Sequence, residues 1–137
     1  MKKYLITALA LVLALCGCNK NNPEKVLSVV GEWQLSAIST KAVSIGSESV
    51  EVYLEFIDGG TFNTFQVLGA GRPRTFSGTW ALTEGQLSGK YSDGKKWGAT
   101  YTVSFDGDNL VLTNSAGGES DTYVPVTIPQ SVRDQAI

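Results

Sequence analysis

The chain has 137 residues, of which 42% are hydrophobic, and its formal charge at neutral pH is −2. It contains no histidine, and its two cysteines, Cys16 and Cys18, both lie near the N-terminus. The rest of the chain therefore has no disulfide, no thiol or imidazole for catalysis, and no cysteine or histidine ligand for a metal. The acidic balance also argues against a nucleic-acid-binding surface.

Residues 1–17 have the pattern of a secretory signal. Two lysines precede an apolar run over residues 5–15, whose length is typical of a signal peptide and too short for a membrane span. If the signal is removed, 120 residues remain and the formal charge becomes −4, because both lysines are lost with it. A chain of that size forms one domain and is long enough to bury a core.

The apolar run ends in Leu15-Cys16-Gly17-Cys18, which resembles the lipobox cut by the lipoprotein signal peptidase. Cys18 has a leucine three places before it and a small glycine directly before it. Cys16 follows bulky Leu15, which fits a small-residue cleavage site poorly. The resemblance implies cleavage before Cys18 and lipidation of Cys18. An ordinary secretory signal or a short buried helix is the alternative interpretation.

Residues 18–30 are predicted to form a lipid-anchored tether. The stretch 19–25 is polar and contains Pro23, as is typical of short linkers. Several acyl chains on Cys18 would hold the protein firmly at a membrane. Because no acidic run follows the cysteine, we expect a lipid-anchored protein of the cell envelope, on the outer membrane and facing the periplasm.

Residues 31–128 are predicted to form one all-β domain. Apolar and polar residues alternate as in strands with one buried face, and Gly-rich turns separate the segments. The clearest hairpin runs from Val50 through Asp58-Gly59-Gly60 to Leu68. A Ser-rich stretch at 39–49 is expected to be a loop. The eight expected strands, at about ten-residue spacing, are 31–38, 50–57, 61–68, 74–83, 86–92, 97–105, 110–115 and 119–128.

The short connections favour an eight-stranded antiparallel up-and-down barrel over a Greek-key sandwich, which needs longer crossovers. Residues 129–137 are expected to be a C-terminal tail with one helical turn, because Ser131 and Asp134 have the spacing of a capping box. Glu51 and Glu55 lie on the strand face predicted to point outward. We interpret that face as solvated rather than as a pair of glycosidase carboxylates.

The domain resembles the lipocalins. Gly31-Glu32-Trp33 is similar to the Gly-x-Trp that opens lipocalin barrels, and segments 54–62 and 78–80 resemble the later signature of lipocalin-like lipoproteins of Gram-negative bacteria. The resemblance covers residues 31–128 and implies a calycin-type barrel with a small-molecule cavity, in which Trp33 plugs the closed end. The chain is shorter than typical lipocalins and has no disulfide in this domain, which argues against a large, lipid-sized cavity.

Six aromatic side chains fall on faces that the alternation directs inward: Phe76, Trp80, Tyr91, Trp97, Tyr101 and Tyr123. Such residues commonly fill the centre of a small barrel, and the alternative is a cavity that orients a ligand. We predict a protein without catalytic activity, cofactor or metal that binds a small hydrophobic or amphipathic molecule, with no inward-facing charge beside the aromatics.

Two other functions are weighed against ligand binding. The first is a protein-interaction or structural module of the envelope, with a filled barrel and no small-molecule ligand. The second is an enzyme, which would need a carboxylate or tyrosine with a perturbed pKa inside a pocket. An enzyme ranks last because histidine and a domain cysteine are both lacking.

Overall fold

A computed structural model describes residues 27–38 and 49–137 of the chain. The predicted signal peptide, Cys18, the first part of the predicted tether and most of the Ser-rich stretch lie outside the described residues. Within the described ranges, no helix is long and apolar enough to cross a membrane.

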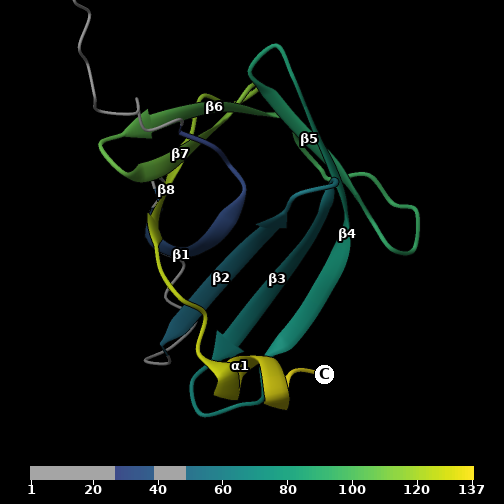
Figure 1. Cartoon of the computed structure of the whole chain (residues 1–137), viewed down its shortest axis with the longest axis vertical. Helices are drawn as coiled ribbons and strands as arrows, with labels where there is room; N and C mark the ends of the chain where they lie inside the picture. The colour runs from purple at the N-terminus through teal and green to yellow at the C-terminus, as the bar shows by residue number, and fades with distance from the viewer. Residues whose placement is uncertain (1–26, 39–48) are drawn as a thin grey trace, which may run out of the picture.

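Eight antiparallel strands follow one another around a closed barrel (Figure 1). Each strand pairs with the next along the chain, and the last strand pairs with the first to close the ring. The predicted fold class is confirmed. The strands are β1 (Gly31–Ile38), β2 (Val50–Ile57), β3 (Thr61–Leu68), β4 (Arg74–Thr83), β5 (Gln86–Tyr91), β6 (Tyr101–Asp106), β7 (Asn109–Asn114) and β8 (Ser120–Pro125).

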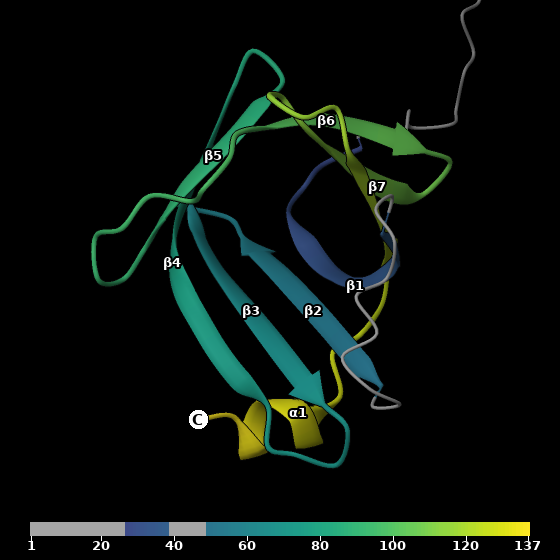
Figure 2. The same cartoon turned by 180° about the vertical axis from the view of Figure 1, so that it is seen from behind.

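The β2–β3 hairpin is the longest continuous ladder that the register describes, from Val50 opposite Leu68 to Ile57 opposite Thr61. Its turn depends on two glycines, because Gly59 and Gly60 have φ angles of 102° and 95°, a region that side chains disfavour. This hairpin forms one wall of the barrel together with β4, as seen from behind in Figure 2.

The interior face of the barrel carries the main hydrophobic core. Phe56, Phe62, Leu87 and Leu110 are fully buried there. Trp33 is also buried, and its indole nitrogen donates a hydrogen bond of 2.8 Å to the carbonyl of Val29, just before β1. A bonded indole nitrogen can be buried without penalty, so this tryptophan packs the end of the barrel where β1 begins.

The predicted strand 97–105 is too long at its start, because β6 begins only at Tyr101. Trp97 lies instead in the loop after β5, where its backbone nitrogen donates to the carbonyl of Gly89 at 2.9 Å. The pairing of β5 with β6 is restricted to Gln86 with Thr102 and Leu87 with Tyr101. The loop between them projects from the barrel in both views (Figures 1 and 2).

The last strand is also shorter than predicted. Pro125 is the final residue of β8 and lies opposite Trp33 of β1, and the next backbone nitrogen, that of Val126, donates to the carbonyl of Glu32 at 3.1 Å. The chain then crosses the outside of the barrel to α1 (Gln130–Gln135). The predicted capping box is wrong: Pro129 is the N-cap without a side-chain hydrogen bond, and Ser131 lies inside the helix.

The helix and the segment before it cover the outer face of β2 and β3. Tyr53 and Phe65 lie opposite each other in the register, and both are buried against Ile128, with Val132 and Ala136 packed on this outer cluster. The sheet is therefore dry on both faces here. Tyr53 and Phe65 therefore point outward without being exposed to solvent, because the C-terminal segment covers the strands.

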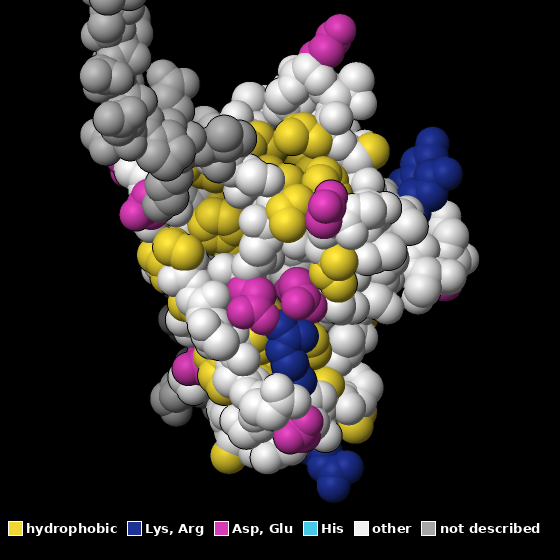
Figure 3. All heavy atoms as spheres, viewed as in Figure 1, with side chains coloured by type: hydrophobic (Ala, Val, Ile, Leu, Met, Phe, Trp, Pro, Cys, Tyr) yellow, Lys and Arg dark blue, Asp and Glu magenta, His cyan; other side chains and the backbone are white. Residues whose placement is uncertain are grey.

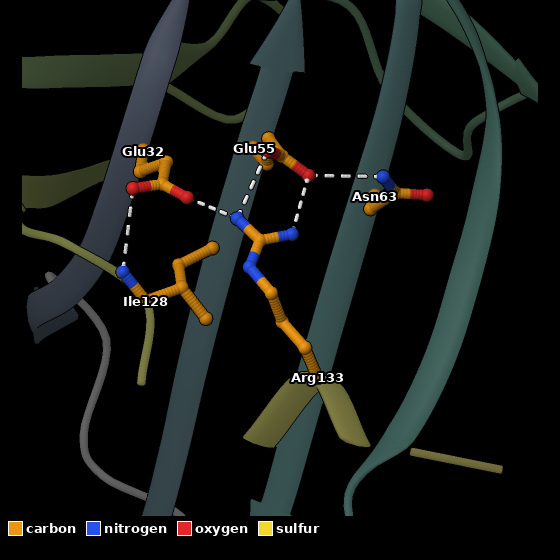
Figure 4. Close-up of polar contacts among 5 residues, drawn as sticks. All are labelled: Glu32, Glu55, Asn63, Ile128 and Arg133. Carbon is orange, nitrogen blue, oxygen red and sulfur yellow. Dashed lines mark hydrogen bonds and ion pairs between the residues drawn. The ribbon is translucent and has the colours of Figure 1, made fainter. Parts of the chain in front are cut away.

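The interpretation of Glu55 as part of a solvated face is wrong for the same reason. Arg133 of α1 reaches across the strands and donates from both terminal nitrogens to Glu55, at 2.9 and 3.1 Å, and one of them also donates to Glu32 (Figure 4). Asn63 donates to the same carboxylate at 3.0 Å. In the space-filling view, basic and acidic side chains meet near the middle of this face (Figure 3). Glu51, by contrast, is exposed.

Candidate functional site

The interior of the barrel is not completely filled. A cavity of about 160 Å³ remains beside the main core. This volume is below the range of roughly 300–1,000 Å³ that is common for ligand pockets. It is close to the roughly 150 Å³ of an engineered apolar cavity that binds benzene. The cavity therefore suits a molecule of about the size of one substituted ring.

One side of the cavity is apolar and another is polar. Leu54, Phe56, Phe62 and Leu112 supply aliphatic and aromatic surface. The polar groups come from four different strands of the barrel: Thr64 of β3, Tyr91 of β5, Tyr101 of β6, and Asp121 and Tyr123 of β8. Their convergence on one space is a property of the closed ring, because these strands are far apart in the sequence.

Trp97 and Gly98 form the wall where β5 and β6 separate. The Trp97 ring packs edge-on against Phe62, with centroids 5.1 Å apart, and against Tyr101 at 6.3 Å. Both distances lie in the range of favourable aromatic pairs. The ring lies so close to Gly89 that a Cβ there would come within 2.3 Å of it. Gly89 thus permits the tryptophan to close the cavity.

The structure brings four of the six predicted aromatics to the cavity: Tyr91, Trp97, Tyr101 and Tyr123. Trp80 does not line it; its ring packs on Phe56 at 5.5 Å, and its indole donates to the carbonyl of Ile57 at 3.2 Å. Phe76 is 41% exposed and contacts Tyr91, and the two rings line a separate hollow. A role of any of the six in ligand binding stays a prediction.

The expectation that no charge accompanies the inward aromatics is wrong. Asp121 lies opposite buried Leu112 in the register and two residues before Tyr123, so it shares their inward face. The signal was present in the sequence, since the alternation of Asp121 and Tyr123 places both on one face of a strand. Attention to aromatic residues alone missed it.

Burial raises the pKa of the Asp121 carboxyl, and the nearby charge of Glu119 raises it further. Burial also raises the pKa of Tyr101 and of Tyr123, with Asp121 adding to both shifts. The physical cause is the same throughout: a partly desolvated site disfavours negative charge. The two phenols stay protonated at neutral pH and can donate or accept hydrogen bonds.

A metal centre is not supported by the described part of the chain. Residues 27–38 and 49–137 contain no group of three or more acidic, cysteine or histidine side chains placed to hold an ion. The cavity instead offers phenol and threonine hydroxyls, one carboxyl and an aromatic wall. Such groups can orient a small organic molecule that combines an apolar body with a hydrogen-bonding end.

Comparisons with solved structures, curated proteins and protein families place the chain among known proteins. A crystal structure of a mutant of the fluorescent protein UnaG is 17% identical, with a TM-score of 0.40 over 72% of this chain and 96% of that chain. A likeness of this degree says nothing about what the chain binds. No curated protein matches the chain. The family described as the lipocalin-like domain matches residues 29–112. Because this match spans more than half of the sequence, the chain belongs to the lipocalin-like domain family.

Proposed function

We propose that the protein is a non-catalytic lipoprotein of the cell envelope that binds a small, mainly apolar molecule inside its barrel. The observation that carries the proposal is the aromatic-lined cavity of about 160 Å³. A filled barrel would leave no such space, and a lipid-sized ligand would need a larger one. The lipocalin-like family and fold are consistent with binding in the barrel interior.

The absence of catalysis is supported by the chemistry of the cavity. Tyr123 has its pKa raised by burial, so its phenol is neither an effective base nor a nucleophile at neutral pH. The sequence has no histidine to accept a proton from a hydroxyl. The envelope location rests on the lipobox-like residues that end at Cys18, and its test is independent of ligand binding.

Ligand binding is tested by titrating the purified full-length protein with ring-sized molecules such as toluene, indole and benzyl alcohol. Trp97 lines the cavity, so a bound ligand should change tryptophan emission in a saturable way. A ligand at a hundred times its dissociation constant should also raise the free energy of unfolding by about 2.7 kcal/mol. A larger probe, such as a long-chain fatty acid, should bind more weakly.

The matched control variant fills the space. Leu112→Phe adds volume to a residue of the cavity wall, and it should reduce the affinity for every ring-sized probe while retaining the fold. If no probe gives a saturable change with the native protein, ligand binding in the barrel is refuted.

An envelope interaction module is the second candidate. One observation favours it: Val50, Leu68 and Phe76 are large hydrophobic residues, each 41% to 52% exposed, and Val50 lies directly opposite Leu68. Exposed apolar surface of this kind can bind a protein partner. Replacing Val50 and Leu68 by serine would weaken a protein contact without changing the affinity for ring-sized molecules.

A further inference from the structure

Within residues 27–38 and 49–137, the side chains that line the cavity include one carboxylate, Asp121, and no lysine or arginine. Among residues 27–38 and 49–137, no hydrogen bond or ion pair to the Asp121 side chain occurs, although the residue is half-buried and lines the cavity. The neighbouring ionisable groups are Tyr91 of β5, Tyr101 of β6, Tyr123 of β8 and Glu119 of the preceding turn. None of these side chains can carry a positive charge.

Glu55 shows how the same barrel stabilises a half-buried carboxylate. It lies on the outer face and accepts hydrogen bonds from Arg133 and Asn63. Removing a charged group from water is unfavourable unless a partner replaces the lost hydration. In the described part of the chain Asp121 has no such partner, and partial burial, which raises the pKa of its carboxyl, disfavours its charge. A ligand with a positively charged group can supply the partner for this carboxylate.

The walls around Asp121 match the other requirements of a cation. Trp97, Tyr101 and Tyr91 present aromatic rings to the same space. Aromatic faces attract ammonium groups, by about 0.5–1 kcal/mol when exposed and more when desolvated. A carboxylate beside several aromatic rings is thus suited to an organic cation, whereas an anion would be repelled by Asp121 and Glu119.

We propose, on the basis of the binding function above, that the cavity selects small molecules that join a protonated amine to an apolar ring. The ammonium group pairs with Asp121 between Tyr101 and Tyr123, and the ring packs against the apolar side formed by Phe62 and Leu112. The cavity of about 160 Å³ admits one ring with a short aminoalkyl group, since a space of nearly the same volume holds benzene.

The test compares benzylamine with benzyl alcohol, which has nearly the same shape but no charge. Calorimetric titration of the purified full-length protein at pH 7 should give benzylamine at least a tenfold lower dissociation constant. Asp121→Asn, which keeps the size and polarity of the side chain, should abolish this preference, so that the two dissociation constants differ by less than about twofold. The control is Asp58→Asn, which removes the same charge from the exposed β2–β3 turn and should keep the preference.

A second measurement uses only the native protein. Benzylamine stays protonated below pH 7, so its affinity should fall as the pH is lowered through the pKa of Asp121, which lies above the ordinary aspartate value. The phenols of Tyr101 and Tyr123, whose pKa values are raised by burial, remain protonated in this range. Glu119→Gln removes the other carboxyl near the cavity, and the affinity for benzylamine should still fall at low pH in that variant. The affinity for benzyl alcohol should not change with pH.

The outcomes separate this inference from the proposed function. Equal affinity for the amine and the alcohol, or a preference that Asp121→Asn retains, would overturn the selection of cations and leave ligand binding intact. Failure of both molecules to bind would overturn the two proposals together. A preference for benzylamine that disappears only with Asp121→Asn supports them both.

Discussion

Arg133→Ala should release the C-terminal helix from the barrel. Glu32 and Glu55 lie directly opposite each other on β1 and β2, an arrangement that is destabilising for like charges. Arg133 donates to both carboxylates and also lies over the ring of Phe65, with its guanidinium carbon 5.6 Å from the centroid. One side chain therefore neutralises a repulsive pair and secures the helix.

The expected loss of stability follows from the repulsion between Glu32 and Glu55 that would remain after the substitution. Both carboxylates accept from the same nitrogen of Arg133, and two unit charges about 4 Å apart repel by about 1 kcal/mol in water and by about 4 kcal/mol at an effective dielectric constant of 20. The side chains of the three charged residues are only 17% to 26% exposed, so the repulsion lies between these limits. With the lost hydrogen bonds, we expect Arg133→Ala to lower the free energy of unfolding by about 2–3 kcal/mol.

The pH dependence gives an independent readout. Hydrogen bonds from Arg133 hold the pKa of Glu55 below its usual value of 4.5. A carboxyl with a lowered folded-state pKa stabilises the fold above the unfolded pKa, and this contribution is lost as the pH falls through the folded pKa. Native protein should therefore lose stability below about pH 4.5 more steeply than the Arg133→Ala variant.

Urea denaturation at pH 7 and pH 3.5 measures both effects. Glu55→Gln in the Arg133→Ala background should recover part of the stability, because it removes the repulsion that the substitution uncovers. Arg133→Lys keeps the charge without the two-nitrogen contact and should be intermediate. If Arg133→Ala is as stable as the native protein and has the same acid profile, the cluster is effectively solvated and does not hold α1.

Three further predictions concern the cavity and the anchor. Gly89→Ala should cost about 1–3 kcal/mol and shift tryptophan emission, because its Cβ would meet the Trp97 ring; exposed Ser88→Ala is the control, and equal effects would contradict the close approach. Asp121→Asn should raise the melting temperature at pH 7, because the raised pKa of this carboxyl means that its ionisation opposes folding. The gain should vanish below about pH 3.8, where the native carboxyl is protonated in both the folded and the unfolded state. An unchanged or lower melting temperature at pH 7 would contradict this prediction. Cys18→Ala should leave uncleaved precursor or lose detergent-phase partitioning, while Cys16→Ala retains it; normal partitioning of the Cys18 variant would refute the lipidation site.

Much of the fold could be predicted from the sequence because its signals are local. Alternation in 50–57 and the glycines at 59 and 60 specify a hairpin without reference to the rest of the chain. The error at Trp97 arose where local signals mislead. Its alternation with Tyr101 is that of a strand, but Trp97 lies in the loop between β5 and β6, where its ring packs against Gly89 and its backbone nitrogen donates to the Gly89 carbonyl.

The candidate site was harder to predict because its composition depends on closure of the ring. Alternation identifies a face of each strand, but it does not say what covers that face. Tyr53 lies between Glu51 and Glu55, on the face predicted to point outward, and is nonetheless buried because Ile128 and α1 cover it. The alternation already indicates that Asp121 lies on the inward face, but its lack of a hydrogen-bond partner in the described part of the chain becomes evident only when the neighbouring strands are in place.

The two half-buried carboxylates divide the barrel into parts with different roles. Glu55 lies on the β2–β3 wall, where an uninterrupted ladder and the ion-paired helix resist opening. Asp121 faces a cavity whose other wall is Trp97 and Tyr101, next to the short β5–β6 ladder. Regions with few backbone hydrogen bonds open at lower free energy than the rest of a fold. Within residues 27–38 and 49–137, the carboxylate without a hydrogen-bond partner and the shortest strand ladder therefore border the same cavity. The proposed ligand would bind beside a part of the barrel that is held by few backbone hydrogen bonds.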